Sequence, residues 1–238
     1  MNSGTSEVLN SNMPPVRAIT MDLDNTLWNI DEVLHRAESN SYRLLSKEFP
    51  RITQRFELSD ILDLRQRIFD EHENIRHDLT AIRIQVFAQL LRSADYEEDH
   101  AEYLMERFSV DRNRVILYPD VIPGLESLSE LYPLVALSDG NSDLSVIGIR
   151  HYFRDCVYAA AVGRMKPHSA GFIKACEAAG ASPAETIHIG DHPEYDIEGA
   201  QRAGMQTMWI RRNGEKWTLP FKPGYTVQTL HEAVEILC

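Results

Sequence analysis

The sequence predicts an α/β fold in which a parallel sheet with crossover helices carries a small all-helical insertion after its first strand. Short apolar runs alternate with helical patterns from residue 118 onward, which is typical of parallel strands joined by helices. Between residues 31 and 115, glycine is absent and apolar residues recur at helical spacing. We therefore expect a core made of residues 16–30 and 116–238, with a helical domain at 31–115.

The expected elements of the core are apolar runs bounded by turn residues and the helical patterns between them. Residues 1–15 are rich in Asn and Ser and end in two prolines, which favours a flexible tail. The run at 16–21 indicates a first strand. After the insertion we expect strands at 133–138, 156–160, 186–190 and 206–210, and helices at 123–131, 142–148, 168–179 and 197–203.

Four amphipathic segments make up the expected insertion. Pro50 closes the first segment, and Asp60, Asp78 and Asp99 lie near the starts of the others, as helix punctuation predicts. The stripes comprise Val33, Leu34, Ala37, Ser41, Leu44 and Leu45; Leu58, Ile61, Leu62, Arg65, Ile68 and Phe69; Leu79, Ile82, Val86, Phe87 and Leu90; and Ala101, Leu104, Met105 and Phe108.

Composition limits the class of protein. A chain of 238 residues with 43% hydrophobic content can bury a sizeable core. The formal net charge of −12 argues against a nucleic-acid or anionic-membrane partner, and no apolar run is long enough to span a bilayer. The first residues lack a signal-peptide pattern, so we expect a cytoplasmic protein. Cys156 and Cys176 are expected to be buried apolar residues in a reducing compartment, with a reactive thiol as the alternative.

The clearest chemical signal is the pair Asp22 and Asp24, directly after the run at 16–21. Ligands of open α/β sheets bind at the carboxyl ends of the strands. Two carboxylates at such an end can hold a cation, and one of them can act as a nucleophile. Alternatively, they are only turn or helix-capping residues.

Two further polar segments follow expected strands. Ser138, Asp139 and Gly140 offer a hydroxyl and successive backbone N–H groups, and the glycine allows close approach to an anion. Lys166, before Pro167, provides a compact positive charge that suits a phosphate or a carboxylate. The ordinary interpretations are a strand-to-helix turn and a solvated lysine.

A third acidic segment follows the strand at 186–190. Asp191 stands directly after it, and Asp196 precedes the next helix. Mg²⁺ is usually held by one or two carboxylates, so Asp191 is an expected ligand, whereas Asp196 is equally consistent with a helix cap. The shared position of all these segments at strand ends favours one site.

The chain resembles the haloacid dehalogenase superfamily in four motifs, which are, in order, Asp22-x-Asp24-x-Thr26, Ser138, Lys166-Pro167 and Gly190-Asp191 with Asp196. The resemblance implies a Rossmann-like, doubly wound core, a mobile cap formed by the helical insertion, and Mg²⁺ as cofactor. It also implies hydrolysis of phosphate esters through an aspartyl phosphate. Family dehalogenases lack the second aspartate, because a halide needs no general acid, whereas Asp24 here can protonate a departing alkoxide.

The resemblance implies a role for each motif residue. The catalytic residues are Asp22 as nucleophile, Asp24 as general acid and base, and Lys166. The substrate phosphate is bound by Thr26, Ser138, Asp139, Gly140 and Lys166, and the metal by Asp22, the Asp24 backbone carbonyl and Asp191, with Asp196 supporting them. Many relatives have Asn where this chain has Asp139, so we expect its N–H to serve the phosphate while its carboxylate turns away.

The substrate is expected to be a small phosphorylated metabolite. The segment His77-Asp78-Leu79-Thr80-x-x-Arg83 and the segment at 203–211 resemble bacterial phosphatases that act on flavin mononucleotide (FMN) and on 5-amino-6-(5-phospho-D-ribitylamino)uracil, a riboflavin-pathway intermediate. Alternatively, Asp78 only caps a helix. A generalist sugar or nucleotide monophosphatase, a phosphomutase, a haloacid dehalogenase and a non-catalytic binding module remain alternatives, as do a monomer and a homodimer.

Overall fold

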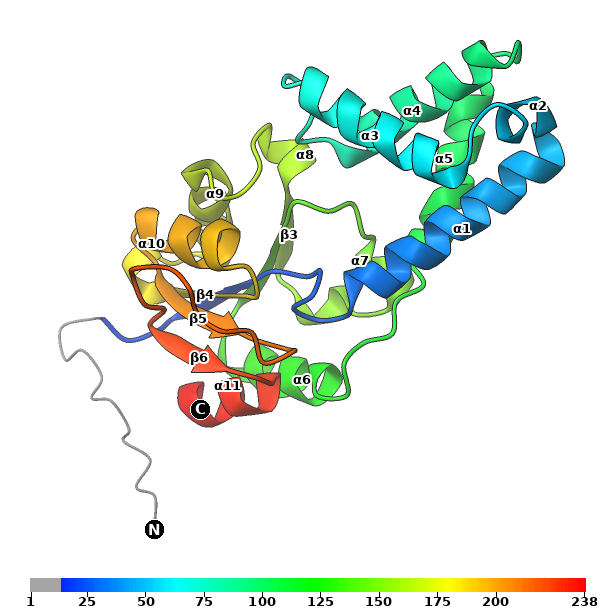
Figure 1. Ribbon diagram of the computed structural model, residues 1–238. Coiled ribbons are helices and arrows are strands. Elements are labelled where there is room, and N and C mark those ends of the chain that lie inside the picture. The colour runs from blue at the N-terminus through cyan, green and yellow to red at the C-terminus, as the bar shows by residue number, and fades with distance from the viewer. Residues whose placement is uncertain (1–13) are drawn as a thin grey trace.

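The described residues, 14–238 of a computed structural model, contain one six-stranded parallel sheet (Figure 1). The expected tail at 1–15 lies outside this description for residues 1–13. The strands stand in the order β3-β2-β1-β4-β5-β6. They are β1 (Ala18–Met21), β2 (Leu134–Ser138), β3 (Asp155–Tyr158), β4 (Thr186–Gly190), β5 (Gln206–Ile210) and β6 (Tyr225–Val227).

The strand order reverses at β1. The chain runs outward from β1 through β2 to β3, and then returns to β4 on the other side of β1. In register, Ile19 pairs with Leu134 of β2 and with Ile187 of β4. The carboxyl ends of these three strands therefore lie side by side at a topological switch point, where doubly wound sheets bind ligands.

Helices cover both faces of the sheet, because alternate residues of each buried strand point to opposite sides. Ile19 and Leu134 pack on the side of α6 (Val121–Leu131) and α11 (Leu230–Leu237). Ala18 and Val135 pack on the side of α9 (Ser169–Ala179) and α10 (Gly199–Arg202). Figure 1 shows α9 and α10 across the sheet from α6 and α11. The remaining short elements are α7 (Leu144–Ile147), α8 (Ala159–Val162), two 3₁₀ turns, η1 (Arg150–Tyr152) and η2 (Pro183–Glu185), and a π-helical turn, η3 (Pro193–Glu198).

The segment between β1 and α6 forms a separate helical layer with its own apolar core (Figure 1). Its helices are α1 (Ile30–Glu48), α2 (Pro50–Thr53), α3 (Leu58–Glu71), α4 (Leu79–Ser93) and α5 (His100–Arg112). Most of the expected stripe residues are buried, including Phe87, Leu90 and Phe108. We call α1–α5 the insert. The expected boundaries of 31–115 for an independent domain stay a prediction.

Several expected elements differ in extent. Pro50 ends α1 but also opens α2 as its first residue, a position that suits proline. The strand expected at 156–160 ends at Tyr158, because the alanines that follow favour the helical turn α8. The helix expected at 197–203 is shortened to α10 by η3, which begins at Pro193 directly after the cap residue His192.

The C-terminal strand β6 and helix α11 had no sequence prediction. Residues 14–238 contain no helix that is long and apolar enough to cross a membrane. The three cysteines are free: Cys176 is buried as expected, Cys156 is partly exposed and Cys238 is exposed.

Candidate active site

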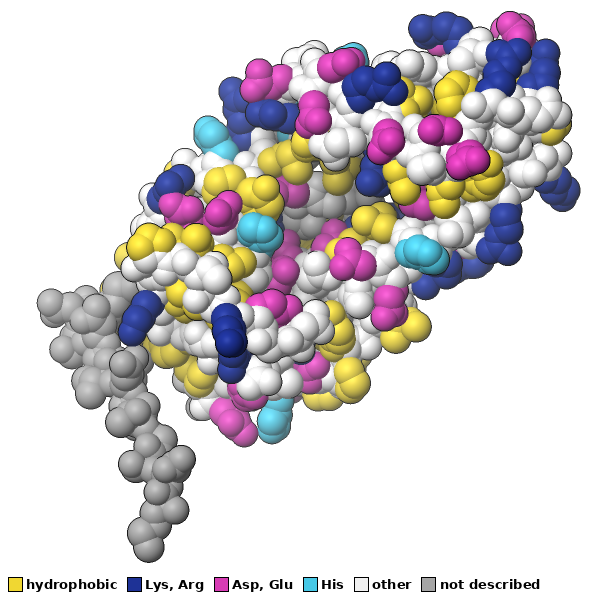
Figure 2. Space-filling model, viewed as in Figure 1, with side chains coloured by type: hydrophobic (Ala, Val, Ile, Leu, Met, Phe, Trp, Pro, Cys, Tyr) yellow, Lys and Arg dark blue, Asp and Glu magenta, His cyan; other side chains and the backbone are white. Residues whose placement is uncertain are grey.

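A cavity of about 170 Å³ lies at the carboxyl ends of β1, β2 and β4. The sequence-predicted site residues meet there, except Thr26, which lies directly behind Asp22. In Figure 2, acidic side chains gather along the hollow between the core and the insert. The lining residues are Asp22, Asp24, Asn25, Ser138, Asp139, Gly140, Lys166, Asp191, His192, Tyr195 and Asp196.

Lys166 is the cation at the centre of this cavity. Its ammonium nitrogen lies 2.5 Å from Asp22 Oδ1 and 2.5 Å from Asp196 Oδ1. Burial alone would lower the pKa of Lys166, but the neighbouring carboxylates of Asp196 and Asp22 outweigh burial and raise it well above its usual value. Lys166 therefore stays charged and holds two acids from different loops together.

Three carboxylates surround this one ammonium. Oxygens of Asp22, Asp191 and Asp196 lie within 4.8 Å of one another. Burial and the neighbouring Asp196 raise the pKa of Asp191 to about 7, and burial also raises the pKa of Asp22 well above its usual value. If all three carboxylates were ionised, their negative charge would exceed what Lys166 neutralises, and their oxygens are donors that Mg²⁺ prefers, so these residues fit a divalent cation.

Asp196 differs from its two neighbours. Burial would raise its pKa, but Lys166 and the hydrogen bond with His188 outweigh burial and hold the pKa below the usual range. Its second oxygen accepts the His192 backbone N–H at 2.9 Å. With its oxygens engaged in this way, Asp196 anchors Lys166 and the loop after β4.

Hydrogen bonds to two acids and to Arg212 hold Thr26 and the loop after β1 in place. The Thr26 hydroxyl lies 3.2 Å from Asp22 Oδ2 and 3.3 Å from Asp191 Oδ1, so it bridges the two acids. Arg212 donates to the Thr26 carbonyl oxygen, at 2.7 Å from Nη2, and to Asp120. Sequence reasoning did not single out Arg212, which stands 186 residues from its acceptor.

The Asp139 carboxylate, in the loop after β2, is bound to the backbone of Lys166. Its two oxygens accept the Lys166 backbone N–H at 3.0 and 3.1 Å. This contact is consistent with the expected turning of the acid, and its role toward phosphate stays a prediction. Ser138 Oγ accepts the Gly140 N–H at 3.0 Å, which leaves the hydroxyl proton able to serve another acceptor.

Asp24 is held between the core and the insert. Trp28 Nε1 donates to Asp24 Oδ1 at 2.9 Å, and Nη2 of Arg112 lies 2.8 Å from each Asp24 oxygen. A Cβ atom at Gly140 would lie 2.5 Å from Asp24 Oδ2, so any larger residue there would displace this carboxylate. Arg112 is the last residue of α5 and is only 3% exposed.

Arg112 is a residue that sequence reasoning missed. An arginine at the end of an amphipathic helix is typical of a solvated last turn, and no local pattern indicates its burial. Its partner Asp24 is 88 residues away in the chain.

A second cavity, of about 240 Å³, adjoins the first on the side of the insert. Asp24 and Gly140 line both cavities, so the two spaces meet at the Asp24 carboxylate. We call the first the phosphate cavity and the second the insert cavity. The walls of the insert cavity are Asp24, Ile30, Leu34, Arg65, Gln66, Phe69, Leu79, Ile82, Arg83, Phe108, Arg112, Gly140 and Asn141.

The segment at 77–83 has mostly structural contacts. Asp78 caps α4, and its Oδ1 accepts the Ala81 N–H at 2.9 Å. This contact matches the alternative in which Asp78 only caps a helix. Arg83 is buried and pairs with Glu38 through two hydrogen bonds of 3.1 and 2.7 Å. Thr80 reaches the core, accepting a hydrogen bond from Asn141 Nδ2 at 3.1 Å.

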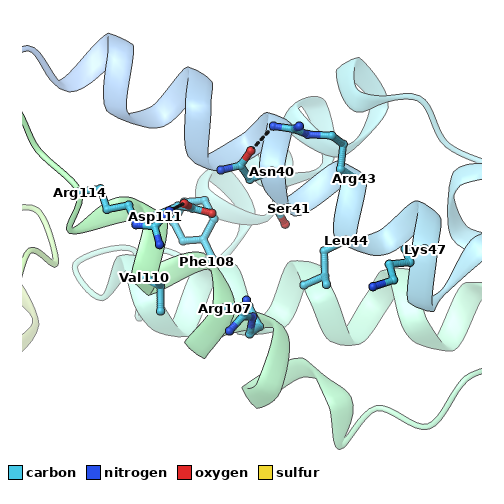
Figure 3. A pocket seen from close by; sticks show the side chains of 10 residues that line it. All are labelled: Asn40, Ser41, Arg43, Leu44, Lys47, Arg107, Phe108, Val110, Asp111 and Arg114. Carbon is cyan, nitrogen blue, oxygen red and sulfur yellow. Dashed lines mark hydrogen bonds and ion pairs between the residues drawn. The ribbon is translucent and has the colours of Figure 1, made fainter.

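A groove of about 350 Å³ opens elsewhere, on the outer side of α1 and α5 (Figure 3). Basic side chains such as Arg43, Lys47 and Arg107 border it, and none of the predicted site residues lines it. Because it lacks the acid cluster, we do not regard it as the reaction site.

Comparisons with known proteins agree with this geometry. The family model described as haloacid dehalogenase-like hydrolase matches residues 16–204. The chain is 31% identical over 205 residues to the 5-amino-6-(5-phospho-D-ribitylamino)uracil phosphatase YigB of Escherichia coli (strain K12), covering 84% of this chain and 86% of that protein. It is 29% identical to the glyceraldehyde 3-phosphate phosphatase of Methanopyrus kandleri, covering 83% and 84%.

A solved structure extends the likeness to nearly the whole chain. The crystal structure of a 2-haloacid dehalogenase from Pseudomonas syringae pv. Tomato DC3000 superposes with a TM-score of 0.87 at 31% identity, covering 93% of this chain and 98% of that one. The match of the family model, the relatives and the structural superposition lead to one conclusion: this chain belongs to the haloacid dehalogenase-like hydrolase family.

Proposed function

We propose that this protein is a Mg²⁺-dependent phosphomonoester hydrolase that works through an aspartyl phosphate on Asp22. The observation that carries the proposal is the position of Asp24, whose carboxylate lines the same cavity as Asp22, Lys166 and the acid cluster. A nucleophile and a second carboxyl group that can carry a proton therefore face one small polar space.

In the first half of the reaction, an oxygen of Asp22 attacks phosphorus in line. The new bond is from Asp22 oxygen to phosphorus, and the bond from phosphorus to the ester oxygen breaks. Asp24 gives its proton to that ester oxygen, so an alcohol departs instead of an alkoxide. Lys166, whose Nζ lies 2.5 Å from Asp22 Oδ1, neutralises negative charge on the transferring group.

In the second half, water attacks the phosphorus of the aspartyl phosphate. Asp24, now ionised, takes a proton from this water, the bond between Asp22 oxygen and phosphorus breaks, and inorganic phosphate leaves. In this proposal, Ser138 and the backbone N–H groups of the loop after β2 would donate to the phosphoryl oxygens.

The residues that would hold Mg²⁺ are Asp22, the backbone carbonyl of Asp24, and Asp191, with Asp196 fixing Lys166 beside them. When bound, the ion neutralises phosphoryl oxygens and orients them for in-line displacement. Support for this assignment is the excess of buried carboxylates over cations described above.

Dehalogenation is less well supported, although the structural relative with 31% identity is named a 2-haloacid dehalogenase, as are several others with lower identity. Displacing a halide from carbon needs no proton for the leaving group and no charge neutralisation of a phosphoryl group. Asp24 and the acid cluster would then serve no step. Phosphatase chemistry uses both.

For the substrate we propose 5-amino-6-(5-phospho-D-ribitylamino)uracil or FMN. The support is the relative YigB, which is named for the former, together with the segment at 77–83 that resembles flavin-pathway phosphatases. A second candidate is a generalist sugar or nucleotide monophosphatase. It is favoured by the similar coverage of relatives with other names, among them glyceraldehyde 3-phosphate phosphatase and human N-acylneuraminate-9-phosphatase.

The test is Mg²⁺-dependent release of phosphate from a panel of FMN, the ribitylaminouracil phosphate, phosphosugars and nucleoside monophosphates, with Asp22→Asn as control. A strong preference for the two flavin-pathway esters supports the specific proposal, and low activity across the whole panel supports the generalist. A phosphosugar isomer in place of free phosphate would indicate a phosphomutase. No turnover of any ester, with or without Mg²⁺, would point to a binding module and contradict the proposal.

A further inference from the structure

Arg112 carries a polar group without a partner at the edge of the insert cavity. Its Nη2 is engaged by Asp24, but its Nη1 is buried and has no hydrogen-bond acceptor among residues 14–238. Leaving such a donor unmet costs free energy, and buried donors in folded proteins nearly always have a partner. The side chain lines the insert cavity, which indicates where the missing acceptor belongs.

The other cations of this cavity already have acceptors. Arg83 donates twice to Glu38, and Arg65 donates to the same carboxylate at 2.8 Å. The guanidinium of Arg83 also stacks on Phe108, 3.6 Å from the ring centre. Arg112 is thus the cation in this wall with a buried N–H still to be satisfied.

The charges in the wall of the insert cavity also favour an acceptor group on the substrate. The guanidinium groups of Arg65, Arg83 and Arg112 face two carboxylates, Glu38 and Asp24. One positive charge is therefore left over on the side of the insert, in a chain whose net charge is −12. An oxygen-rich or anionic group would balance it.

The position of Arg112 beside Asp24 limits where the acceptor group can lie on the substrate. Asp24 lines both cavities, so an ester oxygen that receives its proton lies at the junction. Nη1 and Nη2 are attached to one guanidinium carbon, and Nη2 contacts both Asp24 oxygens. An acceptor for Nη1 is therefore only a few bonds from the ester oxygen, and apolar side chains such as Leu34, Phe69 and Ile82 surround what lies beyond.

We propose that Arg112 is a specificity-determining residue that selects leaving groups bearing an oxygen acceptor, a hydroxyl, carbonyl or carboxylate, a few bonds from the ester oxygen. This inference rests on the proposed phosphatase function. It gives the insert cavity a definite chemical preference, in which Nη1 donates to the substrate while Nη2 keeps Asp24 in place.

The experiment compares esters of similar size. Hydroxyacetone phosphate carries a carbonyl and a hydroxyl, phosphoglycolate carries a carboxylate, and propyl phosphate carries none of these. We expect kcat/KM to be about 10- to 100-fold higher for at least one of the first two than for propyl phosphate, as for a hydrogen bond to a charged donor. Which of the two is preferred shows whether the acceptor is neutral or charged.

Variants of Arg112 test whether its guanidinium group is the donor responsible for this preference. In Arg112→Met, the ratio of kcat/KM for the preferred probe to kcat/KM for propyl phosphate should fall to about one. In Arg112→Lys this ratio should fall only partly, because the charge stays but the fork of donors is lost. Arg65→Met is the matched control, since it removes a cation of the same wall whose partner is Glu38. There we expect the preference to stay within about threefold of the parent protein. Because Arg112 also contacts Asp24, only the ratio between substrates is compared, which cancels effects on the chemical step.

The two proposals can fail separately. Turnover of p-nitrophenyl phosphate, which has no carbonyl or carboxylate, tests the phosphatase function alone. If that ester is hydrolysed and the parent protein shows no preference among the three probes, or Arg112→Met and Arg112→Lys both keep the preference, the assignment of Arg112 is wrong. An equal loss of preference in Arg65→Met would also overturn it, by showing that overall charge decides.

Discussion

The phosphate cavity and the insert cavity are built in contrasting ways. The phosphate cavity is formed by loops at the ends of β1, β2 and β4, and its wall is dense in charge around Lys166. The insert cavity is formed mainly by helices α1, α3, α4 and α5, with apolar side chains and a few arginines. The first is suited to handling a phosphoryl group, whereas the second is suited to recognising what the phosphoryl group is attached to.

The two regions meet at one carboxylate. Asp24 comes from the core, is fixed there by Trp28, and receives Arg112 from the insert. The core thus supplies the reactive group, and the insert contacts that group through Arg112. We expect substitutions in the phosphate cavity to abolish turnover and substitutions in the insert to change selectivity.

The largest effect is expected from Asp22→Asn. The amide keeps the shape of the side chain but is not a nucleophile, so kcat should fall by about 10⁴-fold or more. Because one buried negative charge is removed from the acid cluster, the melting temperature should not decrease. Phosphate release and thermal unfolding measure the two effects, and residual turnover within tenfold of the parent protein would exclude Asp22 as nucleophile.

Asp24→Asn should have a smaller and more selective effect. Removing the general acid should slow single turnover of an alkyl phosphate by about 100-fold or more. The loss should be much smaller for p-nitrophenyl phosphate, whose leaving group departs without a proton. Equal losses for both esters would show that Asp24 acts on something other than the leaving group.

Metal addition should stabilise the phosphate cavity and leave the insert unaffected. At a Mg²⁺ concentration of about 100 times Kd, the free energy of unfolding should rise by about 2.7 kcal/mol. For a chain of this size that corresponds to a rise in melting temperature of roughly 5–10 °C. Scanning calorimetry with and without Mg²⁺ measures it.

Asp191→Asn is the control for that measurement. The amide oxygen can still accept the hydrogen bond from Thr26, 3.3 Å away in the parent protein, but the repelling charge is gone. The metal-free variant should therefore be at least as stable as the parent, and Mg²⁺ should no longer raise its melting temperature. A full response to Mg²⁺ in this variant would remove Asp191 from the ligand set.

The phosphate cavity was accessible to sequence reasoning because its residues lie close to strand ends. Asp22, Ser138 and Asp191 each stand at or directly after the end of a buried strand, and parallel strands bring such ends to one edge. The resemblance to a known family added Lys166 and Asp196, whose own patterns are those of a surface lysine and a helix cap. The structure brings all of them into one cavity, and their chemical roles stay predictions.

The insert cavity was not accessible in this way. Arg112 and Asp24 are 88 residues apart, and Arg212 and Thr26 are 186 residues apart, so no local pattern relates the members of either pair. The helical stripes predicted which side chains are buried, but not which helices face the core. β6 was missed because a strand of three residues is too short to show an alternating pattern.

The smallest expected effect tests whether the insert keeps the position described here while the reaction takes place. Asn141 Nδ2 donates to Thr80 Oγ1 at 3.1 Å, which is a contact between the loop after β2 and the first turn of α4. In Asn141→Ala and Thr80→Val, kcat/KM should fall about two- to tenfold, with little change in melting temperature.

The double variant decides the interpretation. If the contact persists in the reacting complex, the second substitution should cost almost nothing once the first is made, so the losses are not additive. Additive losses would mean that the insert moves away from Asn141 before the chemical step. The hydrogen bonds of Arg112 to Asp24 come from the same insert and would then belong to the substrate-free arrangement alone, because a displacement that separates Thr80 from Asn141 also acts on α5, which packs against α4.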